Sequence, residues 1–148
     1  MHVTCKLYDQ EALPPTGPLF DAGGRLRRDL VLWDGDCGFC RRVVLWLLRR
    51  DTAGRFAALP YQAAPSPPMT PELTTRCERA VHVLTADGRE LRAGRASLYV
   101  LEHLGWGGWA RLLALPPLVW LVEAGYWIVA RNRGFFSRFL FRRRTSTS

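Results

Sequence analysis

The sequence contains almost no lysine: Lys6 is the only one in 148 residues. Arginine therefore carries nearly all of the positive charge, and the formal net charge is +8 at pH 7. A field of this sign attracts acidic partners, membranes or nucleic acid without selecting among them. The arginines are scattered and no known nucleic-acid-binding motif surrounds them, so specific recognition of DNA or RNA is not expected.

Residues 1–29 lack an apolar run long enough for the core of a signal peptide. They hold three prolines and the turn-rich stretch DAGGRLRR, which predicts a loosely held N-terminal extension before the domain. A cytoplasmic location is the default expectation, and thiols are kept reduced in that compartment.

Cysteine is also scarce, with only Cys5, Cys37, Cys40 and Cys77. In a reducing compartment we expect these residues to be catalytic, metal-binding or inert, and not to form a structural disulfide framework. Cys77 has charged neighbours and is either a redox-sensitive surface thiol or has no particular role.

The chain of 148 residues is long enough for one domain, and 48% of its residues are hydrophobic, which is enough for that domain to have its own core.

No uninterrupted apolar segment is long enough to span a membrane. The most apolar stretch, residues 112–130, is broken by two consecutive prolines and by Glu123, which leaves pieces too short to cross ~30 Å of hydrocarbon. We expect two packed helices over residues 110–134. The basic aromatic tail, residues 135–148, could make peripheral contact with an anionic membrane surface. Its other interpretation is a helix end that packs phenylalanines on the core and then frays.

The predicted domain begins with a strand, a helix and a second strand. The short apolar run DLVLW predicts a buried strand at residues 30–33. Apolar residues recur at three- and four-residue intervals over residues 38–50, which predicts an amphipathic helix. The stretch RFAALP, residues 55–60, predicts a second strand, so the three elements form a right-handed parallel crossover.

The next segments predict a loop, a hairpin and further helices. Residues 63–71 are proline-rich and predict a loop. ERAVHVLTADGREL predicts two strands joined at Asp87-Gly88, and residues 93–105 predict a helix closed by glycine. The fold class is therefore α/β, a thioredoxin-like β-α-β-β-β-α sandwich with additional C-terminal helices.

The cysteines of WDGDCGFC lie three residues apart, directly after the first strand. Cys37 is predicted at the N-terminus of the helix and Cys40 one turn later, with their Cβ atoms ~5–6 Å apart. Unpaired backbone N–H groups and the helix dipole favour a thiolate at Cys37, which is therefore the expected nucleophile. Cys40, one turn deeper, is the expected resolving thiol.

Asp34 has two interpretations at this stage. It accepts the proton of Cys40, or it forms the turn and caps the helix. His103 follows Glu102 on a predicted helix and is interpreted as half of a solvent-facing pair.

A zinc site is the alternative use of the pair. Cys37 and Cys40 with Cys77 and His82 make a conceivable Cys3His ligand set, which would belong to a zinc-stabilised binding module docking to a membrane surface or an acidic partner. A pair that opens a helix directly after a buried strand is typical of the redox use instead. We therefore predict no metal and no organic cofactor.

The motif resembles the DCC family of thiol-disulfide oxidoreductases, named for its Asp-x-x-Cys-x-x-Cys signature, here Asp34, Cys37 and Cys40. The resemblance extends through LLRRD and DGRELRAGRAS to YWIVARNRG, over residues 30–134. It implies a thioredoxin-like scaffold, with Cys37 and Cys40 as the redox pair and Asp34 as the third signature position. Residues of the closing motif are interpreted as structural and near the site: Tyr126, Asn132 and Arg133.

The resemblance implies dithiol-disulfide exchange with a disulfide-containing protein or a small thiol, and an electron donor that the sequence does not identify. One departure concerns substrate binding. Thioredoxin-type enzymes usually place a cis-proline just before the third strand, and RCERAVHV has no proline there. This absence argues against substrate binding by strand addition.

Overall fold

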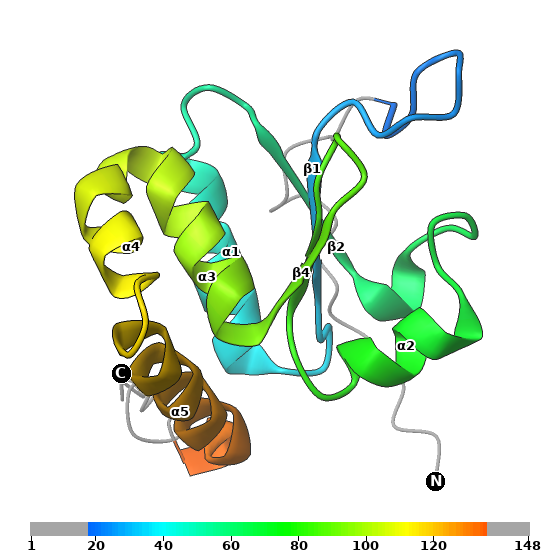
Figure 1. The fold of residues 1–148 in the computed structure, drawn as a ribbon. Coiled ribbons are helices and arrows are strands. Elements are labelled where there is room, and N and C mark those ends of the chain that lie inside the picture. Colours follow the sequence, from blue (N-terminus) through cyan, green and yellow to red (C-terminus); the bar gives the residue numbers. More distant parts are fainter. Residues whose placement is uncertain (1–17, 136–148) are drawn as a thin grey trace, which may run out of the picture.

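The computed structural model describes residues 18–135 and contains one four-stranded mixed sheet (Figure 1). The strand order is β2-β1-β3-β4. The strands are β1 Asp29–Trp33, β2 Phe56–Pro60, β3 His82–Leu84 and β4 Glu90–Arg92. The helices are α1 Gly38–Arg50, α2 Pro71–Cys77, α3 Ala93–Leu101, α4 Gly107–Leu113 and α5 Leu118–Arg131.

The first half is the predicted crossover. β1 and β2 pair in parallel, and α1 connects them. β3 then pairs antiparallel with β1 and forms a hairpin with β4 through the turn at Asp87-Gly88. Gly88 has a φ of +90°, a conformation that glycine adopts without the steric cost of a Cβ. This mixed α/β arrangement confirms the predicted fold class.

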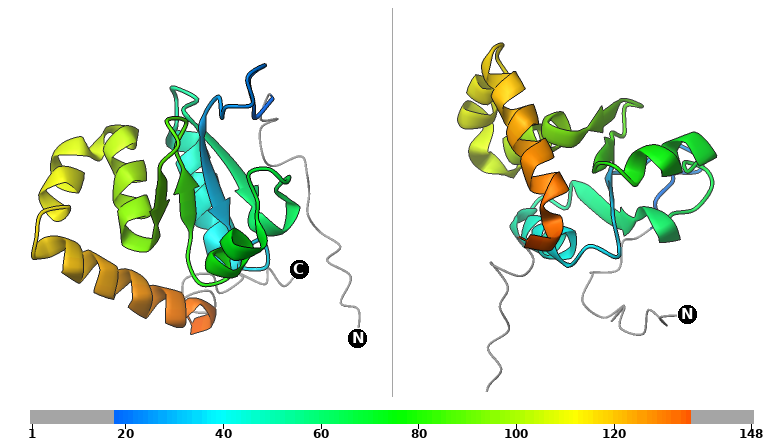
Figure 2. Two further views of the ribbon diagram at one scale, coloured as in Figure 1. Left: turned by 45° about the vertical axis from the view of Figure 1, so that its right-hand side comes forward. Right: turned by 90° about the horizontal axis from the view of Figure 1, so that it is seen from below.

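Alternation along β1 separates two hydrophobic clusters. Val31 and Trp33 face one side of the sheet and pack with α1 and α3. Leu30 and Leu32 face the other side and pack with Leu73 of α2. The period of two along the strand thus builds a three-layer molecule, with α1 and α3 on one face and α2 on the other. Figure 2 shows these layers in two further views.

Helix α2 is an element that the sequence analysis did not predict, because the prolines before it dominated the interpretation. The Thr70 side chain accepts a hydrogen bond from the backbone N–H of Leu73 at 3.1 Å, and Pro71 occupies the first turn. A threonine cap followed by proline is a normal helix start.

The apolar C-terminal region forms the two helices α4 and α5, as predicted for residues 110–134. α3 ends at Leu101 and continues through a π-helical turn, Glu102–Trp106, in which Gly105 has a φ of +98°. Among the described residues no single helix has the length and apolar character to cross a membrane; the helical stretch 93–113 and α5 meet those criteria only together, and they are bent by 116°.

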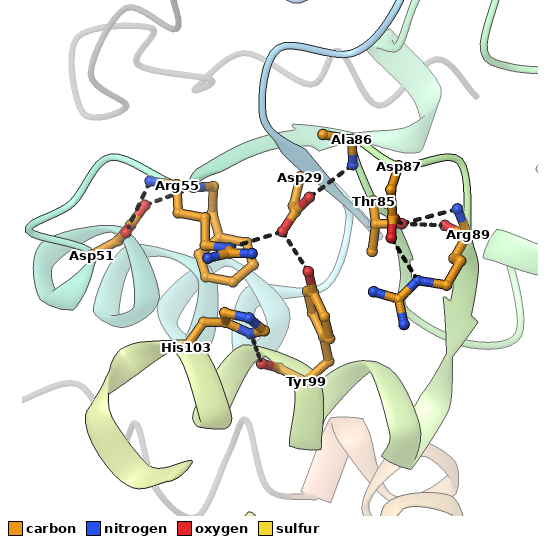
Figure 3. A network of polar contacts seen from close by, with 10 residues as sticks. Asp29, Asp51, Arg55, Thr85, Ala86, Asp87, Arg89, Tyr99 and His103 are labelled. Carbon is orange, nitrogen blue, oxygen red and sulfur yellow. Dashed lines mark hydrogen bonds and ion pairs between the residues drawn. The ribbon is translucent and has the colours of Figure 1, made fainter.

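A buried carboxylate joins several elements at the amino end of β1 (Figure 3). Asp29 accepts hydrogen bonds from the Tyr99 hydroxyl at 2.8 Å, the Arg55 guanidinium at 3.2 Å and the backbone N–H of Ala86 at 2.8 Å. The His103 ring contacts the Tyr99 ring in a tilted arrangement, with centroids 4.3 Å apart and an interplanar angle of 46°. The interpretation of His103 as half of a solvent-facing pair is therefore wrong, since its ring is half-buried and Glu102 pairs with Arg111 instead.

Candidate active site

The site begins at the opposite, carboxyl end of β1, where a tight turn leads into α1. The backbone N–H of Cys37 donates to the Asp34 carbonyl at 3.1 Å. Gly35 packs so closely on the neighbouring strand that a Cβ there would lie 2.9 Å from the Cβ of Pro60. Glycine is therefore required for the turn to rest on β2.

Gln62, just beyond the end of β2, holds this turn in place with two hydrogen bonds. Its side-chain oxygen accepts from the backbone N–H of Gly35 at 3.0 Å, and its amide nitrogen donates to Asp34 Oδ1 at 3.0 Å. Asp34 Oδ1 also accepts from the backbone N–H of Asp36 at 3.0 Å. These contacts agree with the turn-forming interpretation of Asp34.

Cys37 is the N-cap of α1. Its sulfur accepts a hydrogen bond from the backbone N–H of Cys40 at 3.2 Å, the position that a serine or aspartate oxygen usually fills at a helix start. Both cysteines are half-buried free thiols, and both belong to the first turn of one helix. The structure thus brings the two cysteines that the sequence predicted together at the N-terminus of α1.

The surroundings favour the thiolate of Cys37 over that of Cys40. A hydrogen bond from the Cys40 thiol, the Cys40 backbone N–H and the charge of Arg133 outweigh partial burial and lower the pKa of Cys37 to about 6. The same thiol-to-thiolate hydrogen bond, together with burial, raises the pKa of Cys40 above its ordinary value. At neutral pH one sulfur is therefore charged and the other holds the proton.

Arg133 supplies a positive charge to the pair from the far end of the chain. One guanidinium nitrogen lies 3.8 Å from Cys40 Sγ and 3.4 Å from Asp34 Oδ2. The Nε atom donates to the Ala130 carbonyl at 3.0 Å, which orients the guanidinium at the end of α5. Arg133 thus bridges Asp34 and Cys40.

Of the other residues of the closing motif, Tyr126 joins α5 to the residue before β3, and Asn132 caps the end of α5. The Tyr126 hydroxyl accepts a hydrogen bond from the backbone N–H of Val81 at 2.8 Å, and the Asn132 side chain donates to the Ile128 carbonyl at 2.8 Å at the helix end. The Val81 carbonyl accepts from the backbone N–H of Ala93 at 3.0 Å. Both backbone polar groups of Val81, just before β3, are therefore already bonded.

An apolar cleft of about 410 Å³ adjoins the cysteine pair between α1, α3, α5 and the sheet. Cys40, Asp34 and Arg133 contribute to its lining, and most other lining groups are aliphatic or aromatic. Trp33 also lines the cleft, and its buried indole N–H has no hydrogen-bond partner among the described residues. A cleft of this kind suits an apolar group.

Cys77 and His82 are buried in the core. Cys77 is buried in the core, 3.7 Å from His82 Nδ1, and burial raises its pKa to about 11. It is therefore not a surface thiol. Within residues 18–135 no three His, Cys, Asp or Glu side chains are grouped as a metal would require, so the zinc set that the sequence left open is not assembled. Cys5 and the tail beyond Phe135 lie outside the described residues.

Gln62 is the residue of this site that the sequence analysis missed. Its signal was available: the parallel strands β1 and β2 end at the same edge of the sheet, so residues that follow them become neighbours. Arg133 was expected near the site only because of the resemblance, since 99 residues separate it from Asp34.

The comparisons with known proteins agree with this geometry. Residues 31–139 match the family model of DCC1-like thiol-disulfide oxidoreductases. The searches of curated proteins and of solved structures found no match. Because the match covers more than half of the sequence, the chain belongs to the DCC1-like thiol-disulfide oxidoreductase family.

Proposed function

We propose that the protein exchanges dithiols and disulfides through Cys37 and Cys40, without an organic cofactor. The observation that carries this proposal is the sulfur of Cys37 at the helix N-cap, where the backbone N–H of Cys40 and the charge of Arg133 favour its thiolate. A cysteine with a lowered pKa and a second thiol one turn away is the arrangement that dithiol exchange needs.

The reduction of a substrate proceeds in two steps. The Cys37 thiolate attacks one sulfur of the substrate disulfide; a Cys37–substrate disulfide forms, and the other substrate sulfur leaves as a thiolate that takes a proton. Cys40 then loses its proton and attacks the Cys37 sulfur, which forms the Cys37–Cys40 disulfide and releases the second substrate thiolate. Two electrons pass from the enzyme to the substrate, and an external thiol or dithiol restores the pair.

Asp34 is proposed to accept the proton of Cys40 in the second step. Its carboxylate is held by Gln62 and by Arg133, and the same guanidinium contacts the Cys40 sulfur. In the mixed disulfide the Cys37 thiolate no longer raises the pKa of Cys40, but burial still does, so a base that accepts the proton assists the second step.

The proposed substrates are disulfide-containing proteins or small thiols in the cytoplasm. The cleft beside Cys40 gives an apolar side chain next to the substrate disulfide a place to bind. Strand addition at Val81 is not part of this proposal, because its backbone groups are already bonded.

Serine variants test the chemistry directly. Cys37→Ser is expected to abolish turnover of a test disulfide, whereas Cys40→Ser is expected to trap mixed disulfides that mass spectrometry localises to Cys37. Asp34→Asn is expected to slow release from the mixed disulfide more than its formation. Cys77→Ala, which removes a cysteine remote from this chemistry, is the control and should retain turnover. Reduction by the Cys37→Ser, Cys40→Ser double variant at the wild-type rate would refute the proposal.

A further inference from the structure

The large exposed apolar side chains are distributed unevenly over the molecule. Of the eleven among residues 18–135, nine lie between Trp106 and Phe135, and the other two are on α1. Helix α2, the β3–β4 hairpin and residues 18–28 expose none. Figure 2 shows α4 and the start of α5 beyond α3, on the side of the molecule away from α2.

Exposure is highest where α4 and α5 meet at the bend. Trp109, Trp120 and Leu121 are 67%, 70% and 68% exposed. We call this surface the α4–α5 corner; it consists of Trp109, Leu112, Leu115, Trp120 and Leu121. Side chains of this size are seldom left in water together, so a group of them beside one bend marks an interaction site.

Charge on the adjoining chain has one sign. After Glu123 the sequence contains six arginines and no aspartate or glutamate. Glu123 itself is directed toward the start of α3, where its carboxylate accepts from the backbone N–H of Arg95 and packs against Gly94. Arg131, at the end of α5, is exposed.

We propose that the α4–α5 corner docks on an anionic lipid surface. Tryptophan and leucine side chains enter the boundary between headgroups and acyl chains, and the exposed Arg131 at the end of α5 contacts lipid phosphates. Helices bent by 116° lie on such a surface with the corner inserted. Tryptophan suits this position because its ring is apolar and its N–H remains near the polar headgroups.

Vesicle binding by the full chain tests this proposal. The protein is expected to sediment with vesicles of phosphatidylcholine and phosphatidylglycerol, to bind phosphatidylcholine alone at least about tenfold more weakly, and to dissociate as salt rises. Tryptophan emission should shift to shorter wavelength on binding. Trp120→Ser with Leu121→Ser is expected to reduce binding at least about tenfold, because their apolar area no longer leaves water.

A matched pair of charge variants separates this surface from net charge. Arg131→Gln should weaken binding to the anionic vesicles about fivefold, whereas Arg79→Gln, an exposed arginine after α2, should leave it unchanged. Equal losses in both variants would refute the proposal, as would equal binding to the two vesicle types. A stable dimer in sedimentation, disrupted by the corner variant and without vesicle binding, would assign the surface to a second copy and overturn the lipid proposal. No outcome depends on the redox chemistry.

Discussion

At the scale of single residues, the reactivity of Cys37 depends first on the hydrogen bonds from Cys40 and then on the positive charge of Arg133. The pKa of Cys37 is lowered to about 6, so its thiolate fraction rises as pH increases through that value and is nearly complete at pH 7. The rate of alkylation of Cys37 by iodoacetamide should follow this fraction, with a midpoint near pH 6. Mass spectrometry of the alkylated peptide assigns the reaction to Cys37.

Arg133→Met is expected to move this midpoint upward, toward the ordinary value of 9.0 for a cysteine, because the thiolate loses a stabilising positive charge. Arg49→Met at the exposed end of α1 removes an equal charge away from the pair and serves as the control. An unchanged midpoint in the Arg133 variant would mean that the helix N-terminus and Cys40 alone set the thiolate.

Residues close together in the sequence could be predicted from their local pattern, whereas residues brought together by the fold required knowledge of strand pairing or of the family. Asp34, Cys37 and Cys40 fall within seven positions, and their local pattern fixes a turn and a helix cap. Gln62 and Arg133 meet Asp34 only after the strands pair and α5 packs against α3. For Gln62 the parallel pairing of β1 and β2 was the available signal, whereas nothing in the sequence around Arg133 indicates its contact with Asp34.

At the scale of elements, a helix could be predicted when its pattern of apolar residues repeated over several turns. The helix predicted at residues 38–50 has the bounds of α1, since thirteen residues give its apolar face several turns to repeat. Helix α2 spans seven residues and offers no such repetition, so only its Thr70-Pro71 start could have indicated it. The strands β3 and β4 have three residues each and were predicted because Asp87-Gly88 marks the turn between them.

The cleft between α1, α3 and α5 yields a prediction at this scale. Gly125 lines it, and a Cβ at this position meets no atom within 4 Å, so Gly125→Leu should fold and narrow the cleft. We expect a several-fold fall in kcat/KM for peptide disulfides flanked by a large apolar residue, and little change for a small polar disulfide. Gly108→Leu on α4 has equal space and does not line the cleft, so it is the matched control. Equal effects on both substrates would exclude the cleft from substrate binding.

At the scale of the whole molecule, the two ends of β1 have different roles: one carries the reactive cysteines and the other a buried network of hydrogen bonds. The carboxyl end presents the cysteine pair, where half-buried thiols and a bridging arginine remain accessible. The amino end holds Asp29, whose carboxylate receives donors from α3, from the residue before β2 and from the loop between β3 and β4. Stability and reactivity are therefore assigned to opposite edges of one sheet.

Tyr99→Phe tests this division, because it removes one donor from a buried carboxylate and leaves the cysteine pair untouched. Hydrogen bonds to charged groups contribute about 1.5–3 kcal/mol, so the free energy of unfolding should fall by about 2 kcal/mol in urea titrations with an unchanged slope. Tyr61→Phe is the control, since no hydrogen bond of its hydroxyl is found within residues 18–135. The alkylation midpoint of Cys37 should remain near pH 6 in both variants. A shift of that midpoint in Tyr99→Phe would show that the buried network also sets the reactivity of the thiol at the other end of the strand.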